Sequence, residues 1–254
     1  GQATQVDGVD AVTIAFDSYN KISVGSVLGG EIDVKLMDVT NNRTTDIATI
    51  NSNSGPVVRL TYEDITQTLN YGSATGVVID GTHTKNTTYK KYGSSSGYYN
   101  GTSDVTKIKN IVLPSDAKFT MSGWYWIPST NTTIGLIAGS SGYSQIQGSF
   151  ALYIRNTTEF MYYYVPTVGS FNSGKTVGFT IPTDQWIHIA FCLSTLTFYV
   201  NGSSVDIKSV GDGTPVIESI SSYDNTQDIW VGANYHNSTT GQWLKGYVDN
   251  FEIF

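Results

Sequence analysis

The sequence predicts an all-β fold, a sandwich or barrel made of many short strands. No stretch places apolar residues at positions i, i+3, i+4 and i+7 over three turns, so helices are not expected. Instead, short segments rich in β-branched and aromatic residues alternate with clusters of Gly, Pro, Asn, Asp and Ser. Hydrophobic residues make up 39% of the 254 residues and charged residues only 14%, which allows one large core and argues against a disordered chain.

The expected strands follow this alternation in chain order. Their β-branched and aromatic residues suit a half-buried pleated surface. We expect strands at 11–16, 31–37, 57–62, 119–127, 150–154, 160–165, 186–193, 195–200, 229–233 and 246–254. The clusters between them predict turns at 51–56, 94–97, 139–142, 171–174 and 211–215.

A polar seam of low complexity at 40–56 divides the chain. Thr, Asn, Ser and Gly dominate it, with few apolar residues. We therefore expect two parts, a small N-terminal β segment at 1–56 and one large β domain at 57–254. A single domain of about 200 residues is within the usual range for β sandwiches.

Charge and cysteine content exclude several classes of protein. The net charge is −7, and the densest basic groups are only Lys90-Lys91 and Lys107/Lys109, so nucleic acid is not an expected partner. No apolar run approaches the roughly 20 residues that span a membrane, so membrane insertion is not expected. Cys192 is the only cysteine, which excludes an intrachain disulfide framework. The fold must therefore rest on its β core.

Five phrases in the large domain follow one another in an order typical of a known family. They are an aromatic-Asn-Gly turn at 98–104, a Phe-Thr-x-x-x-Trp strand at 119–124, a Trp-x-His-x-Ala strand at 186–190, a Leu-x-x-Tyr-Val-Asn-Gly hairpin at 196–202 and a Gly-x-x-Asp-x-x-x-Ile strand at 246–253. With them, residues 57–254 resemble the laminin-G-like branch of the concanavalin A-like lectin/glucanase superfamily. The resemblance implies two antiparallel sheets in a jelly-roll sandwich, with the first and last strands side by side.

A second resemblance concerns the start of the large domain. Residues 57–62 and 89–101 are similar to the way in which these domains begin in bacteriophage structural proteins. The superfamily fold carries lectins, enzymes, adhesion modules and virion parts, so the fold alone does not fix the function.

Catalytic residues are not expected. The phrase Glu-Ile-Asp-Val-Lys at 31–35 resembles the catalytic strand of glucanases in the superfamily, where two Glu residues act as nucleophile and acid–base. On a strand, Glu31, Asp33 and Lys35 would share one face, so Lys35 stands where the second Glu is needed. A solvated strand face is the simpler interpretation.

Two further reactive side chains are interpreted as structural. His188 matches the structural His of the Trp-x-His-x-Ala strand, and the resemblance implies that it packs between strands. Cys192 lies on the same face as residue 190, and we expect it to be a small buried apolar residue.

The resemblance implies one cofactor, a structural Ca²⁺ ion. Many family members hold it where the first and last strands meet the aromatic-Asp-Gly turn, with the hard oxygen ligands that calcium requires. The matching positions here are Asp249 in the last strand, Glu63 at the end of the first strand, and Asn100 or Gly101 as a source of a carbonyl. The turn reads Asn-Gly, which removes one charge, and a plain hydrogen-bonding role of Asp249 is the alternative.

Saccharide binding is the role most often associated with this architecture. Aromatic rings offer apolar faces to sugar C–H groups, while Asn and Gln side chains hydrogen-bond to hydroxyls. Two loop regions combine these residue types. The predicted ligand-binding residues are Tyr235, His236, Asn237, Gln242, Trp243, Tyr143 and Gln145. As an alternative, Trp243 only covers a sheet edge.

Taken together, these observations favour a non-enzymatic protein of the virion surface, a phage fibre, head decoration or tail component. In this interpretation the large domain binds host surface glycans or neighbouring subunits. Residues 1–56 attach it to the particle or to sister subunits, and a trimer is expected from the way such fibres are built. The alternative is a secreted, extracellular bacterial carbohydrate-binding module or adhesin domain.

Overall fold

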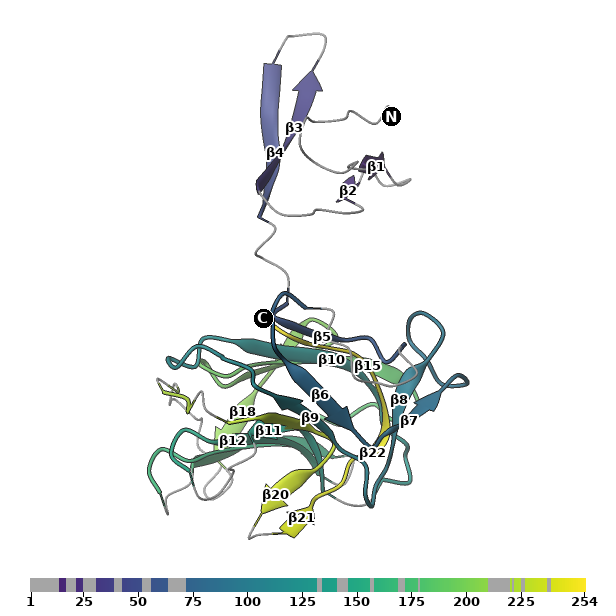
Figure 1. Ribbon diagram of the computed structural model, residues 1–254, viewed down its shortest axis with the longest axis vertical. Coiled ribbons are helices and arrows are strands. Elements are labelled where there is room, and N and C mark those ends of the chain that lie inside the picture. Colours follow the sequence, from purple (N-terminus) through teal and green to yellow (C-terminus); the bar gives the residue numbers. More distant parts are fainter. Residues whose placement is uncertain are drawn as a thin grey trace. The chain divides into compact units, whose positions relative to one another are not determined.

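The computed structural model divides into two compact units, Gly1–Gly55 and Pro56–Phe254 (Figure 1). The division falls one residue before the predicted boundary. No helix in the described part of the chain is long and apolar enough to cross a membrane. The structure describes residues 14–16, 22–24, 31–38, 43–51, 56–63, 72–131, 134–140, 146–155, 158–168, 172–177, 179–209, 220, 222–224, 227–236 and 239–254.

The N-terminal unit contains two antiparallel strand pairs among its described residues. Strand β1 (Ile14–Phe16) pairs with β2 (Ile22–Val24), and β3 (Glu31–Asp38) pairs with β4 (Arg43–Asn51). Strand β4 lies inside the polar segment 40–56 that was expected to divide the chain, so this expectation was wrong for 43–51. The reason is local composition, because Thr and Ile dominate this polar stretch and both are β-branched residues that favour strands.

The large domain consists of two antiparallel eight-stranded sheets within the described residues, which confirms the predicted all-β sandwich (Figure 1). The first, called the β22 sheet, has the order β17-β16-β15-β10-β22-β8-β7, and β5 pairs with β22 as well. Its strands are β5 (Val58–Leu60), β7 (Thr84–Asn86), β8 (Ser96–Asn100), β10 (Thr120–Trp126), β15 (Trp186–Cys192), β16 (Thr197–Val200), β17 (Ser203–Val205) and β22 (Lys245–Ile253).

The second sheet, called the β12 sheet, has the order β18-β14-β13-β12-β11-β19-β9-β6. A separate hairpin, β20 (Asn234–His236) with β21 (Thr239–Gly241), follows β19. The strands of the β12 sheet are β6 (Val78–Gly81), β9 (Thr106–Lys109), β11 (Ile134–Ser140), β12 (Phe150–Arg155), β13 (Glu159–Tyr164), β14 (Asn172–Thr176), β18 (Ile207–Ser209) and β19 (Ile229–Val231).

The first and last strands of the domain lie side by side, as the resemblance implied. Strand β5 pairs antiparallel with the end of β22, with Val58 opposite Ile253. On the same side of β22, β8 pairs with its beginning, where Lys245 lies opposite Asn100. Strand β22 therefore connects β10 on one side with both β5 and β8 on the other.

The core lies between the two sheets and is rich in aromatic side chains. Phe198 of β16 stacks on Phe160 of β13, with ring centroids 5.5 Å apart, and Phe191 lies 4.5 Å from Phe198. On β13, Tyr162 and Tyr164 are buried in this core while Tyr163 points to the opposite face, as the alternation of side chains along a strand predicts.

Several predicted turns overlap strands in the structure, and segment 139–142 contains the end of β11. Segment 94–97 contains the start of β8, and segment 171–174 contains the start of β14. The glycines that suggested turns are needed for close packing: a Cβ on Gly97 would lie 2.6 Å from the Tyr62 ring, and one on Gly174 would meet the Tyr162 ring. The sequence alone does not distinguish a glycine in a turn from a glycine that a closely packed strand requires.

Candidate functional site

The outer face of the β22 sheet is open along its central strands. Residues of β15 alternate strictly between half-buried and buried, and the half-buried set contains Trp186, His188 and Cys192. The predictions that His188 packs between strands and that Cys192 is buried were therefore wrong. Both lie on the solvated face, because they share the register of Trp186, while Ile187 and Phe191 fill the core.

A row of four aromatic side chains crosses this outer face at one register level. Trp186 of β15 lies opposite Trp126 of β10, Trp126 lies opposite Tyr247 of β22, and Tyr247 lies opposite Tyr98 of β8. All four are half-buried. The ring centroids of Trp126 and Trp186 are 6.1 Å apart, and those of Tyr98 and Tyr247 are 5.1 Å apart. The four side chains therefore form one band across four neighbouring strands.

The loop between β7 and β8, residues 87–95, adds two more rings to this surface. Tyr89 stacks on Tyr247 at 4.7 Å and meets the ring of Trp126 at 5.1 Å, while Tyr92 meets Trp124 at 5.9 Å. Tyr89 and Tyr92 are 40% and 49% exposed, so both rings stay accessible from solvent. We call this surface the aromatic face and define it as Tyr89, Tyr92, Tyr98, Trp124, Trp126, Trp186 and Tyr247.

Two carboxylates hold the 87–95 loop on the sheet. Asp249 accepts hydrogen bonds at Oδ2 from the backbone N–H groups of Lys91 (2.8 Å) and Tyr92 (2.9 Å). Glu63 accepts hydrogen bonds from the Ser94 N–H (3.0 Å), the Ser94 hydroxyl and the Ser95 N–H (3.3 Å). The loop is therefore bound to the last strand at one point and to the end of the first strand at the other.

The two carboxyl groups differ in their electrostatics. Burial raises the pKa of Asp249, and the nearby Glu63 carboxylate raises it further, against the hydrogen bonds from the backbone N–H groups of Tyr92, Lys91 and Asn250. Burial also raises the pKa of Glu63, but the hydrogen bonds from Ser94 and Ser95 outweigh it, so the pKa is lowered overall. Asp249 is fully buried, and its Oδ1 has no hydrogen-bond partner within the described residues.

The four predicted calcium ligands are not brought together. Glu63 and Asp249 both face the 87–95 loop, whereas Asn100 lies opposite Lys245, four residues from Asp249 along β22, or about 13 Å. Gly101 follows Asn100 and packs against Lys245. Within the described part of the chain, no three His, Cys, Asp or Glu side chains gather as a metal site would require. Asp249 Oδ1 offers one free oxygen, while Asn100 and Gly101 do not fit the predicted ligand set.

Calcium at Asp249 remains a prediction that a melting experiment tests. If Oδ1 coordinates the ion, about 5 mM EDTA lowers the melting temperature and added Ca²⁺ restores it, because a ligand that binds only the folded state stabilises it. Differential scanning calorimetry measures both changes. A melting temperature that EDTA leaves unchanged would show that calcium does not stabilise the fold.

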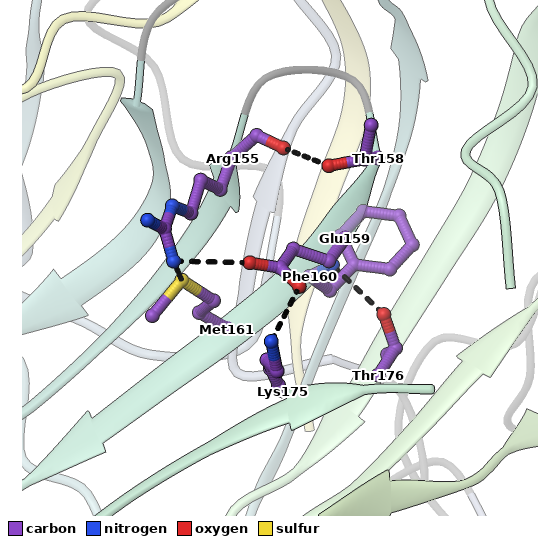
Figure 2. Close-up of polar contacts among 7 residues, drawn as sticks. All are labelled: Arg155, Thr158, Glu159, Phe160, Met161, Lys175 and Thr176. Carbon is purple, nitrogen blue, oxygen red and sulfur yellow. Dashed lines mark hydrogen bonds and ion pairs between the residues drawn. The ribbon is translucent and has the colours of Figure 1, made fainter. Parts of the chain in front are cut away.

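The outer face of the β12 sheet is filled with packed side chains, in contrast to the aromatic face. Leu136, Ala151, Tyr153 and Met161 form a buried cluster there, at most 2% exposed. Beside it, Arg155 lies 3.2 Å and Lys175 3.3 Å from the carboxylate of Glu159 (Figure 2). The Arg155 guanidinium also contacts the Met161 sulfur. The ion pairs and the apolar cluster therefore pack against each other on this face. The β22 sheet therefore offers the more open of the two aromatic surfaces.

The Glu159 pairs predict a modest stability effect. Glu159→Gln removes the charge shared by Arg155 and Lys175, and we expect the free energy of unfolding to fall by about 1 kcal/mol, since both cations are partly exposed. Asp116→Asn, which breaks the more exposed pair with Lys118, is the matched control and is expected to change almost nothing. Urea denaturation measures both. Equal effects of the two substitutions would contradict this interpretation.

The predicted saccharide loop lies beside the β12 sheet. The backbone of Tyr235 and His236 belongs to β20, while Asn237, Tyr143 and Gln145 lie outside the described residues. The Gln242 side-chain oxygen accepts a hydrogen bond from Asn234 (3.0 Å), and its carbonyl accepts one from the Leu136 N–H (2.9 Å). Trp243 is half-buried. Gln242 therefore hydrogen-bonds within the domain, and the role of the predicted residues in saccharide binding stays a prediction.

The aromatic face was not predicted from the sequence, because its residues were interpreted only as parts of the strands that identify the fold. Trp124 and Trp126 are two positions apart on a strand and must share a face, while Tyr125 and Ile127 occupy the other. Since only one face of a strand in a two-layer sandwich faces the core, one of these two apolar sets had to point outward. That spacing was the available signal.

The comparison with known families agrees with this geometry. The family model described as concanavalin A-like lectin/glucanases superfamily matches residues 100–254, which is more than half of the chain. The chain belongs to this superfamily. Its residues from the aromatic-Asn-Gly turn to the last strand carry the match, and four of the seven residues of the aromatic face, Trp124, Trp126, Trp186 and Tyr247, lie inside it. No curated protein matches the sequence significantly.

Solved structures that are similar to this chain share little of its sequence. The binding domain of botulinum neurotoxin serotype C1 gives a TM-score of 0.54 at 13% identity, over 80% of this chain and 49% of that one. The serotype D binding domain gives 0.52 at 13% identity, over 80% and 48%. This chain thus spans about half of their length. Domain 4 of an extracellular arabinanase from Geobacillus stearothermophilus, in complex with arabinotriose, gives 0.48 at 16% identity, over 78% and 91%.

Proposed function

We propose that this protein is a non-enzymatic glycan-binding protein of a virion surface, and that its large domain binds saccharides through the aromatic face. The observation that carries the proposal is the band of Trp186, Trp126, Tyr247 and Tyr98 on a half-buried sheet face that the 87–95 loop covers only in part. Monomeric domains seldom expose a continuous aromatic surface without a binding role. Membership in a superfamily of lectins and glucanases supports a sugar as the ligand.

The chemistry of the surface suits this ligand. Each ring can contact the C–H groups of a sugar, and the contacts add up across the band. Polar groups border the rings: Thr84 lies opposite Tyr98 in the ladder, and Lys91 stands 4.0 Å above the ring of Trp124. Hydroxyl, amide and ammonium groups at the rim can hydrogen-bond to sugar hydroxyls, while the rings supply the contact area. Tyr89 and Tyr92, held by the loop, extend that area.

A glycan array with two single variants separates the aromatic face from the loop predicted from sequence. Trp126→Ala removes the centre of the band, and we expect the array signal to fall about tenfold, the loss of roughly 1.4 kcal/mol of binding energy. Trp243→Ala is the matched control from the predicted loop and is expected to keep the signal. Near-UV circular dichroism checks that both variants are folded. Binding that survives Trp126→Ala and is lost in Trp243→Ala would place the site at the 235–243 loop instead.

The virion setting is a proposal that rests on the beginning of the domain and on the two-part organisation. The phrases at 57–62 and 89–101 are similar to those of phage structural proteins, and the separate unit Gly1–Gly55 is available for attachment to a particle or to sister subunits. A trimer is the expected assembly. Sedimentation equilibrium measures this state, and a monomer without particle association would contradict the proposal.

The alternative is a secreted bacterial carbohydrate-binding module or adhesin domain. The same aromatic face would serve it, because the binding chemistry does not depend on whether a virion or a cell presents the domain. The genes next to this one decide the question: capsid and tail genes support the virion, whereas a hydrolase domain in the same reading frame supports the secreted module.

A further inference from the structure

We propose that the aromatic face binds a single extended chain of a soluble, neutral polysaccharide, laid across the strands from Trp186 to Tyr98. This inference rests on the proposed function and specifies its ligand class. It follows from three features of the surface: the length of the band, the tilt of its rings and the balance of charge around it.

The length of the band fixes the minimum size of the ligand. Trp186, Trp126, Tyr247 and Tyr98 stand on four neighbouring strands at one register level. Three strand spacings of about 4.8 Å give a band about 14 Å long. A monosaccharide can cover only part of this length, whereas a linear oligosaccharide can contact Trp186 and Tyr98 at the two ends and Tyr89, which packs on Trp126 and Tyr247, at the centre.

The tilt of the rings excludes a flat polymer surface as the ligand. The ring planes of Trp126 and Trp186 meet at 74°, those of Tyr89 and Trp126 at 60°, and those of Tyr98 and Tyr247 at 40°. The rings therefore share no common plane, so the flat face of a crystalline polysaccharide cannot lie against all of them at once. A single chain can rotate about its linkages and set successive sugars against differently tilted rings.

The charge around the band favours a neutral ligand. Lys91 lies above Trp124, and Lys245 lies two residues before Tyr247 on the same face of β22. Two carboxylates offset these cations: the exposed Asp184, two residues before Trp186, and the buried Asp249 beneath the loop. The exposed Lys90 of the loop and Glu63, which holds the loop, add one charge of each sign. These six groups carry no net charge together, which complements a polysaccharide without carboxylate or sulfate groups.

Affinity gel electrophoresis of the full chain tests the inference. The probes are soluble hydroxyethyl cellulose, xylan, galactomannan and dextran, with polygalacturonate as the charged polymer and microcrystalline cellulose and crystalline chitin as insoluble surfaces. We expect at least one neutral soluble polymer to retard the protein and neither crystalline polymer to retain it. Trp186→Ala and Tyr98→Ala, at opposite ends of the band, should each weaken retardation about fivefold, because each removes one ring contact. Tyr163→Ala, on the other sheet, is the control and should leave retardation unchanged.

The outcomes separate this inference from the proposed function. Retention on a crystalline polymer, preference for polygalacturonate, or equally strong competition by a monosaccharide would overturn the inference, while glycan binding itself would stand. The same holds if the glycan array is positive but no neutral polymer retards the protein. Self-association that disappears in Trp126→Ala would instead assign the aromatic face to a second copy of the chain. An array without any signal would remove the proposed function as well.

Discussion

Asp249→Ala is expected to lower the free energy of unfolding by about 2 kcal/mol and the affinity for glycans by about tenfold. The substitution leaves the N–H groups of Lys91 and Tyr92 without their acceptor. The 87–95 loop then loses its attachment to β22, and Tyr89 and Tyr92 lose their fixed positions over Tyr247 and Trp124. Urea denaturation measures the first effect and isothermal titration with a bound glycan the second.

Asp249→Asn distinguishes anchoring of the loop from calcium coordination. The Asn side chain keeps one carbonyl oxygen that can accept both N–H hydrogen bonds, so it should restore most of the affinity that Asp249→Ala loses. A calcium ion would be held more weakly by the neutral amide oxygen, because the substitution removes one negative charge from its ligands. If Asn and Ala substitutions are equally damaging and EDTA reproduces their effect, Asp249 is a metal ligand and the anchoring role is wrong.

The second large effect concerns His83 and the pH dependence of stability. His83 is buried in a polar cluster: its Nδ1 lies 2.6 Å from the Thr106 hydroxyl, which lies 2.7 Å from the Tyr99 hydroxyl. Its Nε2 is buried and has no hydrogen-bond partner among the described residues. Burial lowers the pKa of His83 from 6.5 to about 4. A protonated ring would carry an N–H at Nε2 without an acceptor.

The sign of the effect follows from proton linkage. Between pH 6.5 and about pH 4 the unfolded chain binds a proton at His83 that the folded chain does not, so stability falls as the pH falls. The difference amounts to about 3 kcal/mol over this range. We expect His83→Gln to lose this part of the pH dependence, while Asp249 and Glu63 titrate alike in both proteins. Urea denaturation at about pH 7, 5.5 and 4 measures the two curves, and parallel curves would contradict the role of His83.

Much of the fold could be predicted because its strands carry strong local signals. The strands at 119–127, 150–154 and 186–193 were placed within two residues of β10, β12 and β15. Strand β4, which pairs with β3, was missed because the Asn, Ser and Gly residues around it suggested a boundary, although its own Thr and Ile residues favour a strand. The start of β8 was missed because the Gly97 that suggests a turn is required by the Tyr62 ring, a contact between distant segments.

The candidate site was harder to predict, because it depends on which residues of distant strands share one register level. The sequence shows Trp124, Trp126, Trp186 and Tyr247, but not that pairing of β15, β10 and β22 sets three of them in one band. Glu63 and Asp249 were predicted from the family resemblance as calcium ligands. Only the structure shows that both bind backbone N–H groups of the 87–95 loop.

The measurement that tests glycan binding at the aromatic face most directly is a titration with a bound glycan, followed through the five indole N–H signals in two-dimensional ¹H–¹⁵N NMR. The chain has five tryptophans, so the signals can be assigned by single substitutions to Phe. We predict that the signals of Trp124, Trp126 and Trp186 shift on saturation, while those of Trp230 and Trp243 stay in place. Shifts confined to Trp230 or Trp243 would contradict this prediction and move the site away from the aromatic face.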